Sequence, residues 1–221
     1  MRIHFGRVRG LLAGAVLALG VTSPLQAADF SDRGLYLGVS GAYATSLFQE
    51  KILSYAGLPA SAAEIGDSKG FSARLGYRAM SWLALEVQYE WLDTFDFSNS
   101  TLGKFAEYRP QTVTANLKLF LPSGSVQPYL LVGAGISFWE LDMLPFPGEI
   151  PSVPGGQSSG EGFSGRAGLG LNVHLSKHIA LNAEATAVLN TTTLDLDETD
   201  FDQTIGDLYY IAFSAGLTYR F

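Results

Sequence analysis

A period-two alternation of apolar and polar residues recurs eight times between residue 35 and the final residue, Phe221. Successive side chains of a β-strand point to opposite faces of a sheet, so each segment predicts a strand with one apolar and one polar face. The predicted strands cover residues 35–44, 71–78, 83–91, 112–121, 129–139, 163–174, 179–189 and 207–221. An apolar strand face is stable only against another layer of protein or against lipid, and this choice constrains the whole fold.

The connections between these strands alternate strictly between short and long. Those after the second, fourth and sixth strands are a few residues long, and Pro122–Ser125 has the composition of a turn. The other four run through Ser46–Ser68, Asp93–Glu107, Asp142–Glu161 and Asn190–Gly206. A barrel with tight turns at one rim and long loops at the other produces this alternation of short and long connections. The chain is therefore predicted to be all-β, an eight-stranded antiparallel up-and-down β-barrel.

The charged residues of the strands decide which face meets lipid. Only the polar faces carry charge, at Arg74, Arg78, Glu86, Glu90, Lys118, Arg166, Glu184 and Arg220. An arginine or lysine turned outward at the bilayer midplane would cost about 2–4 kcal/mol. The apolar face is therefore predicted to contact lipid and the charged face to line the lumen of a transmembrane barrel. The inverse arrangement, a soluble barrel with an apolar interior, requires more outward charge than these strands supply.

The amino terminus has the pattern of a secretory signal peptide. Arg2, Arg7 and Arg9 precede an apolar run over residues 11–21, which is followed by small residues at the predicted cleavage site after Ala27. The predicted organisation is a signal peptide over residues 1–27 and a barrel domain over residues 28–221. Removal of the signal peptide takes away three arginines and no acid, so the formal net charge moves from −7 to −10. This acidic balance argues against a nucleic-acid partner.

The interior of an eight-stranded barrel is just wide enough for its own side chains to fill. Buried charges must be paired, so the lumen is predicted to hold an ion-pair network of Arg74, Glu86, Lys118, Arg166 and Glu184. The alternative is a gated pore through the same cluster. No catalytic residue, cofactor or metal ligand is predicted.

The signal peptide, the eight alternating strands, the rhythm of the connections and the closing residues 217–221 together resemble the small OmpA/OmpX-type outer-membrane barrels of Gram-negative bacteria. The resemblance covers essentially all of residues 28–221. It implies a monomer in the bacterial outer membrane that contacts membrane lipids and lipopolysaccharide. It also implies that Leu217, Tyr219 and Phe221 form the signal recognised by the barrel assembly machinery.

The resemblance leaves three classes of function open. The first is a non-enzymatic role in envelope integrity or in surface interaction, in which the four long connections contact an unidentified surface ligand. The second is transport of small or hydrophobic solutes, as in small barrels of the OmpW type. The third is an enzyme that resembles lipid A deacylases, with His174, Ser176 and Glu184 as the catalytic group. The predicted topology argues against the third class, because it delivers His174 to a periplasmic turn, away from the outer leaflet.

The fourth long connection is rich in acidic residues. These are Asp195, Asp197, Glu198, Asp200, Asp202 and Asp207. Their spacing does not match an EF-hand, which requires glycine at its sixth position and glutamate at its twelfth. A solvated acidic loop is the favoured interpretation, and a divalent-ion bridge to lipopolysaccharide phosphates is the weaker hypothesis.

Overall fold

The computed structural model describes residues 33–46, 64–99, 103–121, 124–143, 157–193 and 204–221. The predicted signal peptide, residues 1–27, lies outside these ranges, as do Asp195–Asp202 of the acidic connection. Within the described part of the chain, no helix is long and apolar enough to cross a membrane.

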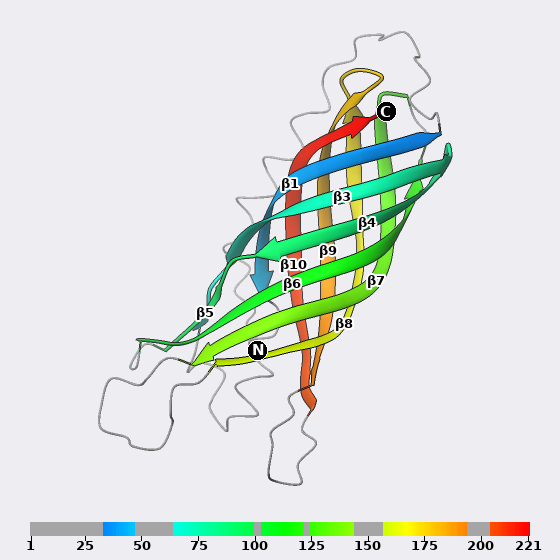
Figure 1. Ribbon diagram of the computed structural model, residues 1–221. Helices are drawn as coiled ribbons and strands as arrows, with labels where there is room; N and C mark the ends of the chain where they lie inside the picture. The colour runs from blue at the N-terminus through cyan, green and yellow to red at the C-terminus, as the bar shows by residue number, and fades with distance from the viewer. Residues whose placement is uncertain (1–32, 47–63, 100–102, 122–123, 144–156, 194–203) are drawn as a thin grey trace, which may run out of the picture.

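Eight long strands form the barrel. They are β1 (Gly34–Ser46), β3 (Ser68–Met80), β4 (Leu83–Leu92), β6 (Gly103–Phe120), β7 (Val126–Met143), β8 (Gln157–His174), β9 (Ile179–Thr193) and β10 (Thr204–Arg220). Each pairs antiparallel with its neighbours, in the order β6-β4-β3-β1-β10-β9-β8-β7, and a further pairing of β6 with β7 closes the ring. Figure 1 shows β10 between β1 and β9. The prediction of an eight-stranded antiparallel barrel is confirmed.

The short and long connections lie at opposite rims. The turns from β3 to β4, from β6 to β7 and from β8 to β9 lie at the rim where the chain ends, at the top of Figure 1. Gly124, in the turn between β6 and β7, has a φ of 69°, a conformation that favours glycine. The four long connections leave from the other rim, which we call the long-connection rim.

The outer face of the barrel is an apolar band. On β4, Leu85 is 57% exposed, whereas its neighbour Glu86, which points into the lumen, is only 3% exposed. Exposed apolar residues recur in this way on all eight barrel strands. Because soluble monomers rarely expose so large an apolar surface, the band is the surface that contacts the hydrocarbon of the membrane.

The pattern of the strands inverts near the long-connection rim. Along β6, the outward residues from Leu119 to Val113 are apolar or small, but Arg109 and Glu107 are charged. The inward residues of the same segment are apolar, and Ala106 and Tyr108 are buried. This segment therefore has the polarity of a soluble sheet, with its polar side outward, and it marks where β6 leaves the membrane.

Two short strands, β2 (Glu64–Ile65) and β5 (Phe95–Asn99), extend the sheet at this rim. β5 pairs with β6 on one side and with β2 on the other. The prediction of a long loop over Asp93–Glu107 is therefore wrong in part, because β5 and the start of β6 form a hairpin there. The prediction relied on an apolar outward face, and outside the bilayer that criterion no longer applies. We call β5 and the adjoining ends of β6, β7 and β8 the rim extension.

Candidate functional site

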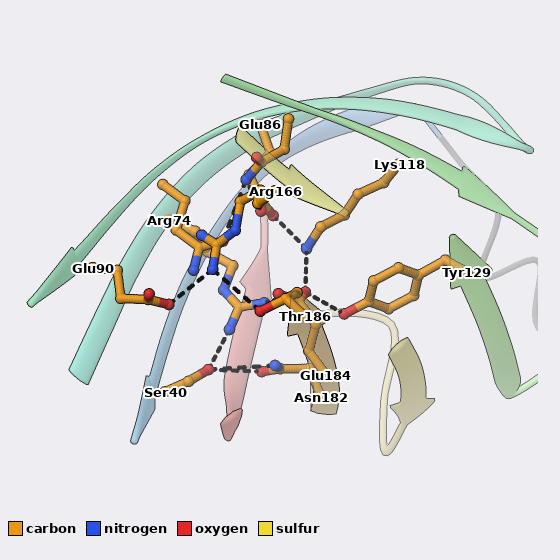
Figure 2. Close-up of polar contacts among 12 residues, drawn as sticks. Ser40, Arg74, Glu86, Glu90, Lys118, Tyr129, Arg166, Asn182, Glu184 and Thr186 are labelled. Atoms are coloured by element: carbon orange, nitrogen blue, oxygen red, sulfur yellow. Dashed lines mark hydrogen bonds and ion pairs between the residues drawn. The ribbon is translucent and has the colours of Figure 1, made fainter. Parts of the chain in front are cut away.

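A network of buried charges occupies the middle of the lumen (Figure 2). The Nζ atom of Lys118 lies 2.9 Å from Glu86 Oε2 and 3.2 Å from Glu184 Oε2. Arg74 Nη1 lies 3.7 Å from the same Glu184 oxygen, and Arg74 Nη2 donates to Ser40 Oγ. The structure thus brings four of the five predicted lumenal residues together, on β3, β4, β6 and β9.

The fifth predicted residue, Arg166, has a different partner. Its Nη2 atom lies 2.9 Å from Glu90 Oε2 and 3.4 Å from Thr186 Oγ1. Glu90 falls on the polar face of its strand, but alternation alone does not show which charge lies across the lumen from which. The network therefore contains three cations and three carboxylates, all of them buried.

Each of the three glutamates also accepts a hydrogen bond from a tyrosine. The hydroxyl of Tyr36 donates to Glu86 at 3.0 Å, that of Tyr129 to Glu184 at 2.9 Å and that of Tyr210 to Glu90 at 3.0 Å. Sequence reasoning missed these tyrosines as members of the network. The available signal was their position in the alternation. All three tyrosines fall on the polar, lumen-facing side of their strands, and not on the side that faces lipid. Hydrogen bonds to charged groups are stronger than neutral ones, so these hydroxyls stabilise the ionised glutamates.

Glycines on neighbouring strands make room for two of these tyrosine rings. Tyr36 of β1 pairs across the sheet with Gly76 of β3, and Tyr129 of β7 pairs with Gly170 of β8. A Cβ atom on either glycine would overlap the tyrosine ring. The rings can therefore lie across the barrel wall only because these positions carry no side chain.

Apolar clusters fill the lumen on both sides of the charged network. Toward the long-connection rim, Phe95 of β5 lies 5.9 Å from Tyr210 of β10 and 6.4 Å from Tyr108, measured between ring centroids. Because β5 and β10 are not neighbours in the sheet, the contact with Tyr210 crosses the lumen. Toward the short-turn rim, Phe120 and Tyr129 pack in a second cluster, with ring centroids 5.1 Å apart.

One part of the lumenal wall carries buried polar atoms that no described protein group satisfies. These are Nε2 of Gln88, Oγ1 of Thr112 and Thr114, Oγ of Ser137 and Ser164, Nε and Nη1 of Arg166, and the amide atoms of Asn190. Most of these residues are cross-strand neighbours along β4, β6, β7, β8 and β9. Buried polar groups are ordinarily hydrogen-bonded to protein or to ordered water. This stretch of wall is therefore suited to contact water or a small polar solute.

The three residues of the deacylase hypothesis have separate partners. His174 Nε2 lies 3.3 Å from Gln127 Oε1, and Ser176 Oγ accepts hydrogen bonds from the backbone of His178 and Ile179 at 3.3 and 3.1 Å. Glu184 belongs to the lumenal network. No described contact joins the three side chains, and Ser176 stabilises the turn between β8 and β9. Among the described residues, no group of three or more His, Asp or Glu side chains is arranged to hold a metal ion.

Of the residues of the predicted assembly signal, Leu217 and Tyr219 lie on the outer face of β10, and Phe221 follows the strand directly. Leu217, Tyr219 and Phe221 are all exposed, and the rings of Tyr219 and Phe221 meet edge to face with centroids 5.3 Å apart. They form a lipid-facing patch at the short-turn rim. Of the acidic fourth connection, only Asp207 lies in the described residues, within β10.

The closed barrel and its apolar outer band define a transmembrane β-barrel of the bacterial outer membrane. The chain belongs to the outer membrane protein beta-barrel domain family, whose model matches residues 13–221. In such barrels the short turns lie in the periplasm and the long connections outside the cell.

Solved structures with a similar fold include neisserial surface protein A (NspA), at 17% identity and a TM-score of 0.50, with 85% of this chain and 97% of that chain covered. OprG from Pseudomonas aeruginosa matches at 13% identity and a TM-score of 0.49, with 85% and 96% covered. Ail from Yersinia pestis matches at 17% identity and a TM-score of 0.47, with 86% and 100% covered. A comparison with curated protein sequences finds no match.

Proposed function

We propose that this protein is a non-conducting, non-enzymatic outer-membrane barrel that supports the envelope and presents its extracellular rim for surface interaction. The observation that carries the proposal is the occupied lumen, in which a balanced charge network lies between two apolar clusters. A continuous ion path would have to separate these buried pairs. Because these charges are buried, paired and hydrogen-bonded, separating them is unfavourable, which supports a filled lumen.

The proposed partners follow from the exposed surfaces. The apolar band runs round the whole barrel and is covered by membrane lipid. This arrangement supports a monomer. Lipopolysaccharide is the outer-leaflet partner, and the barrel assembly machinery is the partner proposed for Leu217, Tyr219 and Phe221. The rim extension, with its outward charges, is the described part of the surface offered to an extracellular ligand.

Single-channel recording tests the closed lumen. Purified protein in planar bilayers is expected to show no persistent openings, and a general porin prepared in the same way controls for insertion. Persistent large conductance steps would defeat the proposal. A deletion strain is expected to become more sensitive to detergents than its parent while its uptake of small solutes stays the same.

Transport of a small solute is the second candidate, and the partly unsatisfied polar wall favours it. Liposomes that contain the protein would then swell in small neutral solutes. Replacement of Thr114 and Ser164 by valine and alanine would slow the swelling, because it removes hydroxyls from that wall. Absence of swelling in liposomes of wild-type protein favours the closed barrel.

A further inference from the structure

A groove of about 320 Å³ lies on the outer wall of the barrel at the extracellular end of β6, β7 and β8. The outward-facing residues that line it are Arg109, Gln111, Phe138, Glu140, Ser159 and Glu161. We call this feature the outer groove. Its volume is at the lower end of the range of ligand pockets in proteins, about 300–1,000 Å³, so it can take the end of one large side chain.

The strand register places the outer groove just outside the membrane. Val113, Ile136 and Phe163 pair across the three strands and form the last apolar row. The next rows toward the outside are Gln111–Phe138–Glu161 and Arg109–Glu140–Ser159. The groove therefore opens above the apolar band, on the extracellular side, where a soluble molecule can reach it.

The outer face of the rim extension carries more carboxylates than cations. Its described charged residues are the acids Asp96, Glu107, Glu140, Asp142 and Glu161 and the cations Lys104 and Arg109. Each of the two cations already contacts at least two of the carboxylates. This face therefore has a surplus of negative charge, which favours a positively charged ligand.

Glu140 and Glu161 are the carboxylates that line the outer groove itself. The side chain of Glu140 is 60% exposed and comes no closer than 4.0 Å to Arg109 Nη1, whereas Glu107 and Asp142 hold the same guanidinium at 2.6 and 3.1 Å. Glu161 is exposed and forms no ion pair with a described residue. The charge of these two groove carboxylates is therefore available to an incoming cation.

Phe138 adds an aromatic ring beside both carboxylates. It pairs directly with Glu161 across the sheet, lies two residues from Glu140 on β7, and is 42% exposed. Cations are attracted to the faces of aromatic rings, and a guanidinium can donate two parallel hydrogen bonds to one carboxylate. An arginine side chain matches the groove, because its planar head can stack on Phe138 while its N–H groups donate to Glu140 or Glu161.

We propose that the extracellular ligand of the rim extension is a basic polypeptide, and that one of its arginine side chains binds in the outer groove. Other basic residues of this ligand would face the surplus carboxylates above the groove, which also attract it before contact. The same charges would repel an anionic ligand. The proposal rests on the surface-interaction role in the proposed function and names the chemical class of the ligand.

Fluorescence anisotropy with a labelled tetra-arginine peptide tests the outer groove. The full chain is held in nanodiscs of phosphatidylcholine, a lipid without net charge. The wild type is expected to bind tetra-arginine and to bind tetra-citrulline far more weakly, because citrulline keeps the shape of arginine but not its charge. Glu161→Gln and Phe138→Leu are each expected to weaken binding of tetra-arginine about fivefold to tenfold, since each removes one contact of the guanidinium.

Two matched controls separate the outer groove from general effects of charge and of exposed rings. Asp93→Asn removes an exposed carboxylate at the same rim but outside the groove. Phe71→Leu removes an exposed ring from the same row of outward residues, which runs through Trp91 to Gln111. Both controls are expected to bind tetra-arginine as tightly as the wild type does. A heat-dependent gel shift confirms that each variant is folded.

The proposal has two parts that can fail separately. No binding of tetra-arginine by the wild type, or equal binding of tetra-citrulline, would overturn the basic ligand. Wild-type affinity in both groove variants, or an equal loss in the two controls, would overturn the outer groove as its site. None of these results changes the conductance of the barrel or the detergent sensitivity of a deletion strain, so a failure here is distinguishable from a failure of the proposed function.

Discussion

Two lysines in this protein make the same contact in opposite surroundings. In the lumen, Lys118 bridges Glu86 and Glu184 at 2.9 and 3.2 Å. In the rim extension, Lys104 bridges Asp96 and Glu107 at 2.8 and 2.7 Å. The side chain of Lys118 is 3% exposed and that of Lys104 is 37% exposed.

The comparison shows that distance alone does not set the importance of an ion pair. Loss of Lys118 would leave two carboxylates unpaired where water cannot replace the missing cation. Loss of Lys104 would leave two carboxylates that water and salt can screen. The lumenal contact is therefore expected to contribute strongly to the stability of the barrel, and the rim contact is expected to contribute little.

The largest difference is expected from Lys118→Met. Because both partner glutamates stay buried, the free energy of unfolding is expected to fall by about 3–5 kcal/mol. Denaturant titration of the protein refolded in lipid vesicles measures the change. A loss below about 1 kcal/mol would mean that the buried glutamates take up protons or water at little cost, and the contrast with the rim would disappear.

Tyr129→Phe sharpens the comparison by removing one hydroxyl and no charge. Glu184 then keeps its cations but loses the hydrogen bond at 2.9 Å, so the expected loss is about 1.5–3 kcal/mol in the same titration. Tyr89→Phe is the matched control, because its hydroxyl donates to Gln111 on the outer wall at the same distance. A larger loss from the control would contradict the special role of the lumen.

Gly76→Ala tests the space that the lumenal network requires. The added methyl group would displace the Tyr36 ring from Glu86, which is expected to lower stability by about 1–3 kcal/mol. Gly41→Ala is the control, because a Cβ atom there faces outward and meets no atom within 4 Å. Equal unfolding midpoints for the two variants would show that Tyr36 can move without loss.

Lys104→Met is expected to have the smallest effect of the substitutions. Exposed ion pairs contribute about 0–1 kcal/mol, so the unfolding free energy should fall by no more than this. Raising the salt concentration should shrink even this difference, because both partners are accessible to ions. A loss as large as that of Lys118→Met would remove the distinction between the two lysines.

The pH dependence of the rim contact provides the finest test. The hydrogen bond from Lys104 lowers the pKa of Glu107 below its usual 4.5, so the contact contributes stability above that pH and loses it as the pH falls through the lowered value. The difference between wild type and Lys104→Met should therefore be present at neutral pH and vanish at strongly acidic pH. A difference that grows on acidification would contradict the assigned partner.

The same contrast between lumen and rim explains what could be predicted from sequence. Within the membrane, every second residue of a strand faces lipid and is apolar. The alternation in the sequence therefore reveals all eight strands. At the rim extension, Phe95 and Tyr108 point inward while Glu107 and Arg109 point outward, and the inverted pattern hid β5 and the start of β6.

For the lumen, alternation placed Arg74, Glu86, Lys118, Arg166 and Glu184 on one face but left their pairing open. Arg166 lies against Glu90 rather than against the other four, because the tilt and stagger of the strands decide which residues meet across the barrel.

The sequence by itself therefore determined the number of strands, the face that meets lipid and the set of charges inside. The reason is that the bilayer requires every strand that crosses it to turn apolar residues outward and charged residues inward. Only the tertiary structure decided which charges pair and which tyrosines donate to the glutamates. Those contacts join strands that are distant in sequence, and their geometry depends on how the sheet closes on itself.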